Sequence, residues 1–173
     1  EIMPSLVGSE MCKETEHTSP ASQPAELSGK WRHNTCDNIN DAWSQGCRGW
    51  RNQWKLAYTQ DPSASAIYRP TIGVEGEYEV YEWHGDKTDA EEATNVKYEI
   101  YHKNGIETKT VNQRQNYGKW NYLGTYYFEK GNSGYVKISA KGTNGIVIAD
   151  AVKFVYKGGK GSSPPQPPQG KGG

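Results

Sequence analysis

The sequence predicts an all-β protein, an antiparallel β-sandwich of the jelly-roll kind, and three observations support this prediction. Residues 120–156 contain three strand-like runs, and a glycine-bearing turn separates each run from the next. The chain has 12 tyrosines and 20 glycines, and leucine is scarce, a mixture that favours strands and turns over helices. Similar runs lie upstream, and together they give about eight or nine strands, enough for two packed sheets.

The three C-terminal runs differ in pattern. Residues 120–128 are aromatic and mostly β-forming. Residues 135–140 alternate, with Val136, Ile138 and Ala140 on one face. Residues 146–152 are apolar at almost every position, so we expect this strand in the middle of a sheet with both faces covered.

The first upstream runs are short. We expect an edge strand at residues 2–7, the first firm strand at 27–33 and a strand at 50–58. Trp43, Trp50 and Trp54 also recur at spacings compatible with a helix, so a short helix is the alternative here. Residues 64–70 end in proline, which is typical of an edge strand or a strand end.

One strand and one hairpin complete the element prediction. Residues 77–83 form a strand with a bulge, because Tyr78 and Val80 share one parity whereas Tyr81 and Trp83 take the other. Residues 96–102 and 106–113 pair as a hairpin. Its two-residue turn is Asn104-Gly105, in which both positions tolerate positive φ.

Several motifs carry a family resemblance. They are W-N-Y-L-G-T-Y-Y-F at 120–128, G-Y-V-K-I-S at 134–139 and G-I-V-I-A-D-A-V-K-F at 145–154, with Y-R-P at 68–70, G-E-Y-E-V-Y-E-W at 76–83 and V-N-Q-R at 111–114 upstream. Together they resemble the golvesin C-terminal-like domain, a non-catalytic β-sandwich module of secreted, often polysaccharide-acting, proteins. The resemblance covers roughly residues 27–156 and implies carbohydrate binding.

Composition divides the chain into three parts. Residues 1–26 are an N-terminal extension, expected as loop after residue 7. Residues 27–157 are the sandwich domain, and 158–173 a tail rich in Gly, Pro and Gln that is expected to be flexible. The chain opens with Glu1-Ile2 and no initiator Met, which indicates a processed, exported product. We therefore expect an extracellular or cell-surface location. No run of about 18 apolar residues is present, so no membrane span is expected.

Charge and motifs exclude two function classes. The 20 basic and 20 acidic residues balance, whereas a nucleic-acid-binding domain would show a basic stripe. No G-x-S-x-G, H-E-x-x-H or P-loop motif occurs, and the four histidines are scattered without a triad-like context. We therefore expect neither nucleic-acid binding nor enzymatic activity.

The three cysteines suggest cross-linking. Cys36 and Cys47 flank a short polar loop, and a disulfide between them would stabilise the fold by about 3 kcal/mol. A zinc site is the alternative, but the usual close Cys or His pairs are missing. Cys12 is then left as a free thiol or for a bond to another chain, and its pairing with Cys36 or Cys47 stays open.

Asp150 stands out because it lies in the most apolar strand. A buried carboxylate needs hydrogen bonds, a counter-charge or a metal, and we expect a structural anchor to a loop backbone. Calcium is the alternative. The nearby acidic loop has the oxygen ligands for it, although no EF-hand spacing, in Asp86, Asp89, Glu91 and Glu92. No cofactor is expected otherwise.

The aromatic residues carry the binding prediction. Six tryptophans and 12 tyrosines exceed what a core of this size needs. The candidates for ligand binding lie in or beside predicted loops and are Trp43, Trp50, Trp54 and Tyr117. Trp83 and Trp120, by contrast, are expected in the core.

Two functions follow as hypotheses. The first is a self-assembling structural subunit of a cell-surface filament or sheath, because the domain stands without an enzyme, both ends carry extra segments and one cysteine is unpaired. Its partner would be other copies of the chain. The alternative is a carbohydrate-binding module of a secreted or cell-surface protein, with extracellular polysaccharide as the partner.

Overall fold

The computed structural model describes residues 19–22, 24–34, 56–85 and 91–159. In these ranges the chain forms strands, turns and loops, and no helix. None of the described segments could therefore cross a membrane as a helix. The all-β, antiparallel prediction is confirmed, since every pair of neighbouring strands in the sheets is antiparallel.

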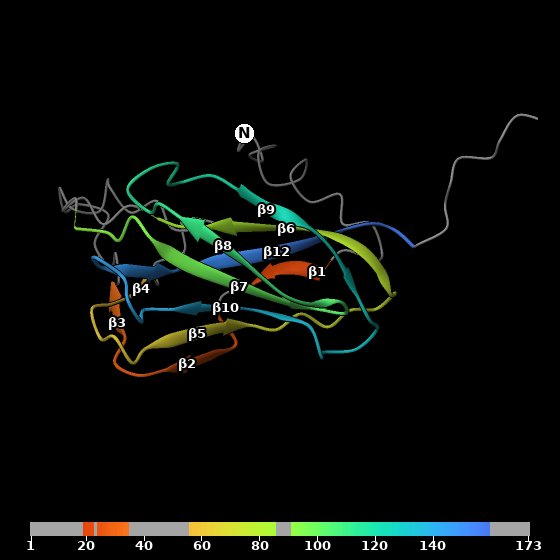
Figure 1. Ribbon diagram of the computed structural model, residues 1–173, viewed down its shortest axis with the longest axis horizontal. Coiled ribbons are helices and arrows are strands. Elements are labelled where there is room, and N and C mark those ends of the chain that lie inside the picture. The colour runs from red at the N-terminus through yellow and green to blue at the C-terminus, as the bar shows by residue number, and fades with distance from the viewer. Residues whose placement is uncertain (1–18, 23, 35–55, 86–90, 160–173) are drawn as a thin grey trace, which may run out of the picture.

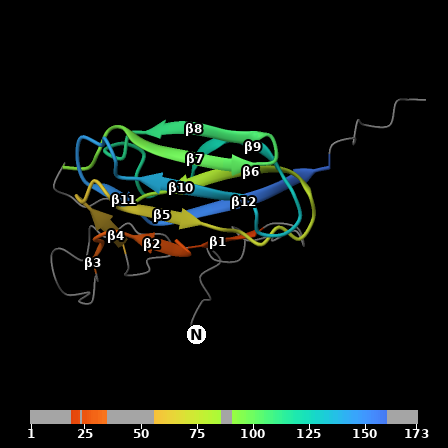
Figure 2. The ribbon, with the colours of Figure 1, turned by 60° about the horizontal axis from the view of Figure 1, so that its bottom comes forward.

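Three sheets form the molecule. Sheet A has the order β1-β12-β6-β9, from bottom to top in Figure 1, with bounds Ser19–Ser22, Ala151–Gly158, Gly76–Trp83 and Asn121–Phe128. Sheet B has the order β2-β5-β10-β7-β8, which Figure 2 shows from bottom to top, with bounds Glu26–Ser28, Ser65–Tyr68, Tyr135–Ser139, Val96–His102 and Gly105–Val111. A small sheet C has the order β11-β4-β3, with bounds Val147–Ala149, Leu56–Thr59 and Arg32–Asn34.

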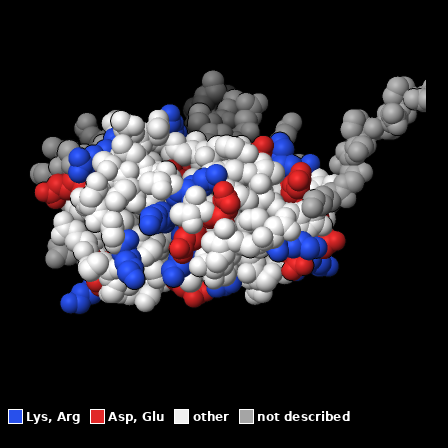
Figure 3. Space-filling view, in the orientation of Figure 1, with Lys and Arg blue, Asp and Glu red and all other residues white. Residues whose placement is uncertain are grey.

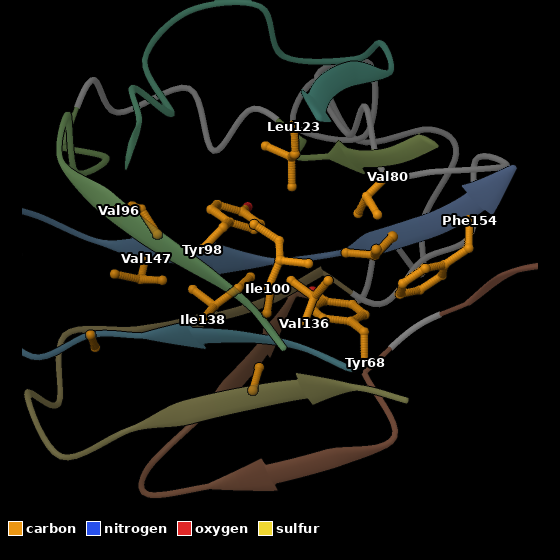
Figure 4. Packing of buried hydrophobic residues seen from close by; sticks show 14 of the residues in the cluster. Tyr68, Val80, Val96, Tyr98, Ile100, Leu123, Val136, Ile138, Val147 and Phe154 are labelled. Carbon is orange, nitrogen blue, oxygen red and sulfur yellow. The ribbon is translucent and has the colours of Figure 1, made fainter. Parts of the chain in front are cut away.

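Sheets A and B pack face to face as a sandwich. The chain passes from one sheet to the other between β5 and β6, β6 and β7, β8 and β9, and β9 and β10, as in a jelly roll. Figure 4 shows side chains from both sheets meeting between them, among them Val80, Leu123 and Phe154 from sheet A and Tyr98, Ile100 and Val136 from sheet B. This interior is the hydrophobic core.

Most predicted strands lie where expected, and the last one is divided. The run at residues 146–156 forms β11 and β12, which belong to different sheets and are separated by Asp150. β12 lies between β1 and β6 and is central as expected, but β11, which holds residues 147–149 of the apolar run, lies at the edge of sheet C, so the central position is confirmed only for the end of the run. Residues 147–152 are all buried, as their apolar run predicted.

Three local predictions were wrong, and a fourth holds in one of its two alternatives. The run at 27–33 is two strands, β2 and β3, because Gly29 turns the chain with φ 84°. β5 lies between β2 and β10 and is not an edge strand, but it ends at Tyr68, before Pro70, so the alternative of a strand end holds. The β7–β8 turn is Lys103-Asn104 rather than Asn104-Gly105, since His102 pairs with Gly105 and only the glycine has positive φ. Residues 19–22, expected as loop, form β1.

Charges are evenly mixed on the surface. On the face shown in Figure 3, Lys and Arg side chains lie among Asp and Glu side chains, with no large patch of one sign. This agrees with the formal net charge of zero and gives no basic stripe on that face.

Candidate functional site

The outer surface of sheet A carries a group of aromatic rings. In β6 the even-numbered side chains from Tyr78 onward are buried, so the odd-numbered Tyr81 and Trp83 face outward. Tyr122 of β9 lies beside Tyr81, and Trp120, just before β9, lies beside Trp83. We call this surface the aromatic face; it comprises Tyr81, Trp83, Trp120, Tyr122 and the cation Lys153.

The rings of the aromatic face support one another. Trp83 and Trp120 meet edge to face with centroids 5.4 Å apart, and Tyr81 and Tyr122 lie 5.5 Å apart. The Nζ atom of Lys153 lies 4.5 Å from the Trp120 ring centroid and 4.9 Å from that of Tyr81. The tryptophans and Tyr81 are half-buried, whereas Tyr122 is 58% exposed. The result is a firm aromatic surface that remains open to solvent.

A bulge in β9 produces this arrangement. Val80 pairs with Gly124 and the next residue, Tyr81, pairs with Tyr122, so β9 has one extra residue at this point. Leu123 therefore stays in the core while Tyr122 faces outward. The sequence predicted a bulge in β6, but β6 alternates regularly and the extra residue lies in the neighbouring strand.

Hydrogen bonds give the aromatic face a polar edge. The hydroxyl of Tyr81 donates to Glu79 Oε2 at 2.8 Å, and Lys157 Nζ lies 3.4 Å from Glu79 Oε1. Burial, then the hydrogen bond to Glu79, then the charge of Glu79, raise the pKa of Tyr81 to about 12. Tyr81 is thus a neutral phenol at physiological pH.

A buried polar network lies on the inner side of β6. Glu82 and His84 both have side chains that are 0% exposed. Glu82 accepts hydrogen bonds from the Tyr98 hydroxyl at 3.1 Å and from Asn121 Nδ2 at 2.7 Å. Gln113 Nε2 donates in turn to the Tyr98 hydroxyl at 3.1 Å. The network joins β6, β7, β9 and the β8–β9 connection.

The surroundings of His84 favour the ring with a proton on both nitrogens. Its Nε2 faces the carbonyl oxygen of Gln115 at 2.8 Å, and its Nδ1 faces the carboxylate of Glu82 at 3.0 Å. A carbonyl oxygen and a carboxylate are both acceptors, so both contacts are satisfied when both ring nitrogens donate. Burial lowers the pKa of His84, but the hydrogen bond and charge of Glu82 outweigh it, and the pKa is raised on balance.

The β8–β9 connection carries Tyr117 and Trp120 and is held by this network. Asn116 and Gly118 adopt positive φ of 59° and 69°, which Asn and Gly tolerate best. Gln113 is buried and pairs with the backbone of Ile148 as a strand would: its Oε1 accepts from Ile148 N and its Nε2 donates to Ile148 O, both at 2.8 Å. The connection is therefore fixed to the core.

A pocket of about 350 Å³ lies at the other end of β9. Its lining includes Tyr101, His102, Ile106, Phe128, Ser133 and Tyr135. Tyr101 and Tyr135 stack on each other at 4.2 Å, and the guanidinium of Arg69 lies 4.5 Å from the Tyr135 centroid. The pocket is thus bordered by a stacked pair of tyrosines from sheet B and by the cation of Arg69.

The predicted site residues have different outcomes. Tyr117 is half-buried in the β8–β9 connection, and Asp150 is 1% exposed between β11 and β12. The prediction that Trp83 and Trp120 belong to the core was wrong, because both lie on the outside of sheet A. The other predicted residues lie outside the described ranges, namely Trp43, Trp50, Trp54, Cys12, Cys36, Cys47, Asp86 and Asp89.

Metal binding stays a prediction. Within the described ranges, no three His, Cys, Asp or Glu side chains lie close enough together to hold a metal ion. Glu91 is exposed and Glu92 is buried at the end of the acidic loop, and the loop's two aspartates fall outside the described residues.

Sequence reasoning missed the two residues that organise the site. Glu82 belongs to an alternating acidic pattern that usually marks a solvated face, and His84 stands without a motif. The signal was the parity of β6: once Tyr78 and Val80 are placed inside, Glu82 and His84 must also point inward, and Tyr81 and Trp83 outward.

Comparisons with known proteins identify relatives. Over 126 residues the chain is 38% identical to a xanthan lyase of Bacillus sp. (strain GL1), a match covering 61% of this chain and 13% of that protein. A solved Paenibacillus xanthan lyase superposes with a TM-score of 0.66 at 30% identity, covering 82% of this chain and 13% of the lyase. The chain thus spans about an eighth of these enzymes.

A more distant likeness is to a carbohydrate-binding module of Cellvibrio mixtus lichenase 5A, solved with cellotriose. It covers 82% of this chain and 97% of the module, but at 13% identity and a TM-score of 0.44 it is too remote to carry an argument. The family model of the golvesin C-terminal domain matches residues 18–156, which is most of the chain. The protein therefore belongs to the golvesin C-terminal domain family.

Proposed function

We propose that this domain is a non-catalytic module that binds an extracellular polysaccharide on the aromatic face. The observation that carries the proposal is the set of half-exposed rings on the outside of sheet A, whose inner side is fixed by the buried hydrogen-bond network. Such surfaces mark interaction sites, and Tyr and Trp offer a flat apolar ring together with a polar atom. A pyranose ring has the matching chemistry, with C–H groups on its faces and hydroxyls at its edge.

Charged and polar groups beside the rings suit the same ligand. Lys153 places an ammonium over two rings, and Glu79 lies next to the Tyr81 hydroxyl. A few polar groups at an apolar surface fix a ligand's orientation. The proposed module would stack sugar rings on the aromatics and bind their hydroxyls or carboxylates with these groups.

The relatives support the polysaccharide class. Both are named as xanthan lyases, enzymes of a polysaccharide, and this chain corresponds to a small part of each. A small non-catalytic part of such an enzyme could hold the protein on its substrate. The same relationship supports the proposed extracellular or cell-surface location.

Burial argues against catalysis by the charged cluster. Glu82 and His84 resemble an acid–base pair, but a group that is 0% exposed cannot reach a polymer. The phenol of Tyr81, with a pKa of about 12, is poorly matched to proton abstraction near neutral pH. Binding is therefore the better-supported role. The filament-subunit hypothesis has no support from the described residues or from the relatives.

Affinity electrophoresis in gels containing xanthan or other acidic and neutral polysaccharides tests the proposal. We expect at least one polymer to retard the full chain. Trp120→Ala should weaken binding about tenfold or more, since a central aromatic contact is commonly worth over 1 kcal/mol. The matched control is Tyr135→Ala, which removes a ring from sheet B and should leave retardation unchanged. Equal retardation of both variants would refute the placement of the site, and no retardation by any polymer would refute the function.

A further inference from the structure

The segment of residues 115–121, here called the Trp120 loop, is attached to β6 through buried polar groups. His84 Nε2 donates to the carbonyl oxygen of Gln115, and the amide of Gly118 donates to the carbonyl oxygen of His84 at 2.9 Å. The loop is thus bound to one residue at two points. Trp120, two residues after Gly118 in the same loop, contacts Trp83 on the opposite side of the strand from the His84 side chain.

A third attachment runs through Asn121. Its Nδ2 donates to Glu82 Oε1 at 2.7 Å and lies 3.1 Å and 3.3 Å from the carbonyl oxygens of Asn116 and Lys119. The same carboxylate therefore contacts His84 and the side chain that closes the loop. Two of the three attachments use the His84 ring or the Glu82 carboxylate, and the third is the backbone bond from Gly118 to His84, whose position depends on how that ring is held.

We propose that the buried Glu82–His84 pair positions the Trp120 loop, so that the aromatic face is assembled while His84 is protonated and is loosened when His84 loses its proton. The inference rests on the proposed function for its consequence on binding. Glu82 and His84 do not touch the ligand, and both act through the loop as positioning residues.

The chemistry of His84 gives the direction of the effect. Neutral imidazole has one N–H, so it can donate to Glu82 or to Gln115 but not to both. One buried acceptor then faces a bare nitrogen, a repulsive contact that weakens the attachment. Because the folded pKa is raised above 6.5, the stabilisation is complete below pH 6.5 and is lost as the pH rises through the folded value.

Other ionisable groups surround the pair. Tyr98 of β7 donates to Glu82, and Tyr68 of β5 is buried and feels the charges of Glu82 and Asp150. Asp150 also raises the pKa of His84 through its charge. Burial first, and then the charges of Asp150 and Glu82 at Tyr68 and of Glu82 at Tyr98, raise the pKa values of both tyrosines well above 10, so they stay neutral where His84 titrates. Among His84, Tyr68 and Tyr98, the imidazole is therefore the group expected to change charge near neutrality.

Glu82→Gln is the decisive variant. Its amide can donate one N–H to the bare Nδ1 of neutral His84, while its Oε1 still accepts from Asn121, so a neutral form of the attachment is retained. By NMR, the full chain should show the amide of Gly118 losing exchange protection as the His84 ring titrates. Glu82→Gln should keep this protection constant over the same pH range. Protection that is independent of His84 titration in the native chain, or equally pH-dependent in Glu82→Gln, would overturn the inference.

Binding is measured separately, by titrating the retarding polysaccharide at several pH values. The dissociation constant of the native chain for the polysaccharide should rise as His84 deprotonates. The expected rise is about tenfold for each unit by which the pKa of His84 differs between the attached and the detached loop. Glu82→Gln should bind with no such dependence. If the loop responds to pH but binding does not, the inferred effect on the site is wrong. If the loop responds and no polysaccharide binds at any pH, the proposed function fails with the binding half of the inference, while the positioning of the loop is supported.

His84→Phe is the complementary variant, in which the attachment through the ring of His84 is removed at every pH. The ring volume is kept and both hydrogen bonds are removed, so Gly118 should be unprotected at every pH and binding should be weak at every pH. Full protection and native affinity in this variant would contradict the role of His84. If it fails to fold, the Glu82→Gln comparison decides the question alone.

Discussion

Replacing Gln113 with leucine should expose how much the buried network contributes to stability. Gln113 is 1% exposed, and its carboxamide pairs with both the N–H and the C=O of Ile148, which is 0% exposed. Leucine has nearly the same size, so the change leaves little cavity. It does leave two buried backbone groups without these partners.

The magnitude follows from those two groups. An unpaired buried donor or acceptor costs about 1–3 kcal/mol, so Gln113→Leu should lower the free energy of unfolding by about 2–6 kcal/mol. The Tyr98 hydroxyl loses one donor but keeps its bond to Glu82, so its contribution is smaller. Against a typical total of about 5–15 kcal/mol, the loss is severe.

Urea unfolding, followed by tryptophan fluorescence and circular dichroism, measures this loss. The matched control is Gln115→Leu, the same substitution two residues away at an exposed side chain, which should change stability by less than about 0.5 kcal/mol. A loss below about 1 kcal/mol for Gln113→Leu, with native spectra, would refute the reasoning. It would mean that water or a shifted backbone satisfies Ile148.

Two further predictions concern packing and alkaline pH. Gly134→Ala should destabilise by about 1–3 kcal/mol, because a methyl group there would overlap the Phe128 ring, whereas Gly73→Ala, with no atom within 4 Å, should be near neutral in the same urea assay. Equal stability of the two variants would contradict the close packing of Gly134 against Phe128. Stability should also fall between pH 10 and 12, because unfolded tyrosines lose protons near 10.0 while folded ones keep theirs; a flat urea midpoint over this range would be inconsistent with the raised pKa values of Tyr68, Tyr81, Tyr98 and Tyr126.

Strand positions could be predicted well from the sequence because alternation and turn residues are local signals. Residues 96–102 form β7 as predicted, whereas the apolar run at 146–152, expected mid-sheet, is divided between β11 at the edge of sheet C and the central β12. The hairpin turn was displaced by one residue, because the Asn-Gly pattern does not fix which residues pair. Gly105 belongs to β8 and pairs with His102.

The candidate site was harder to predict, because it depends on hydrogen bonds between residues that are far apart in the sequence. The alternating acidic pattern of β6 is typical of a solvated face, but Asn121 and Tyr98 supply the hydrogen bonds that make the burial of Glu82 possible. With Glu82 inside, the neighbouring Trp83 must be outside, although tryptophan alone suggests a core residue. Polarity alone therefore predicts the wrong orientation at this end of β6, with Glu82 outside and Trp83 inside.

The most direct test of the account follows the indole N–H signals of the full chain by NMR while the retarding polysaccharide's oligosaccharides are added. Six tryptophans give six signals, which Trp→Phe variants assign. Binding on the aromatic face predicts that the signals of Trp83 and Trp120 shift together and saturate with one affinity, and that Trp31 stays unchanged. Shifts confined to Trp43, Trp50 and Trp54 would contradict the account and place the binding surface where the sequence alone predicted it.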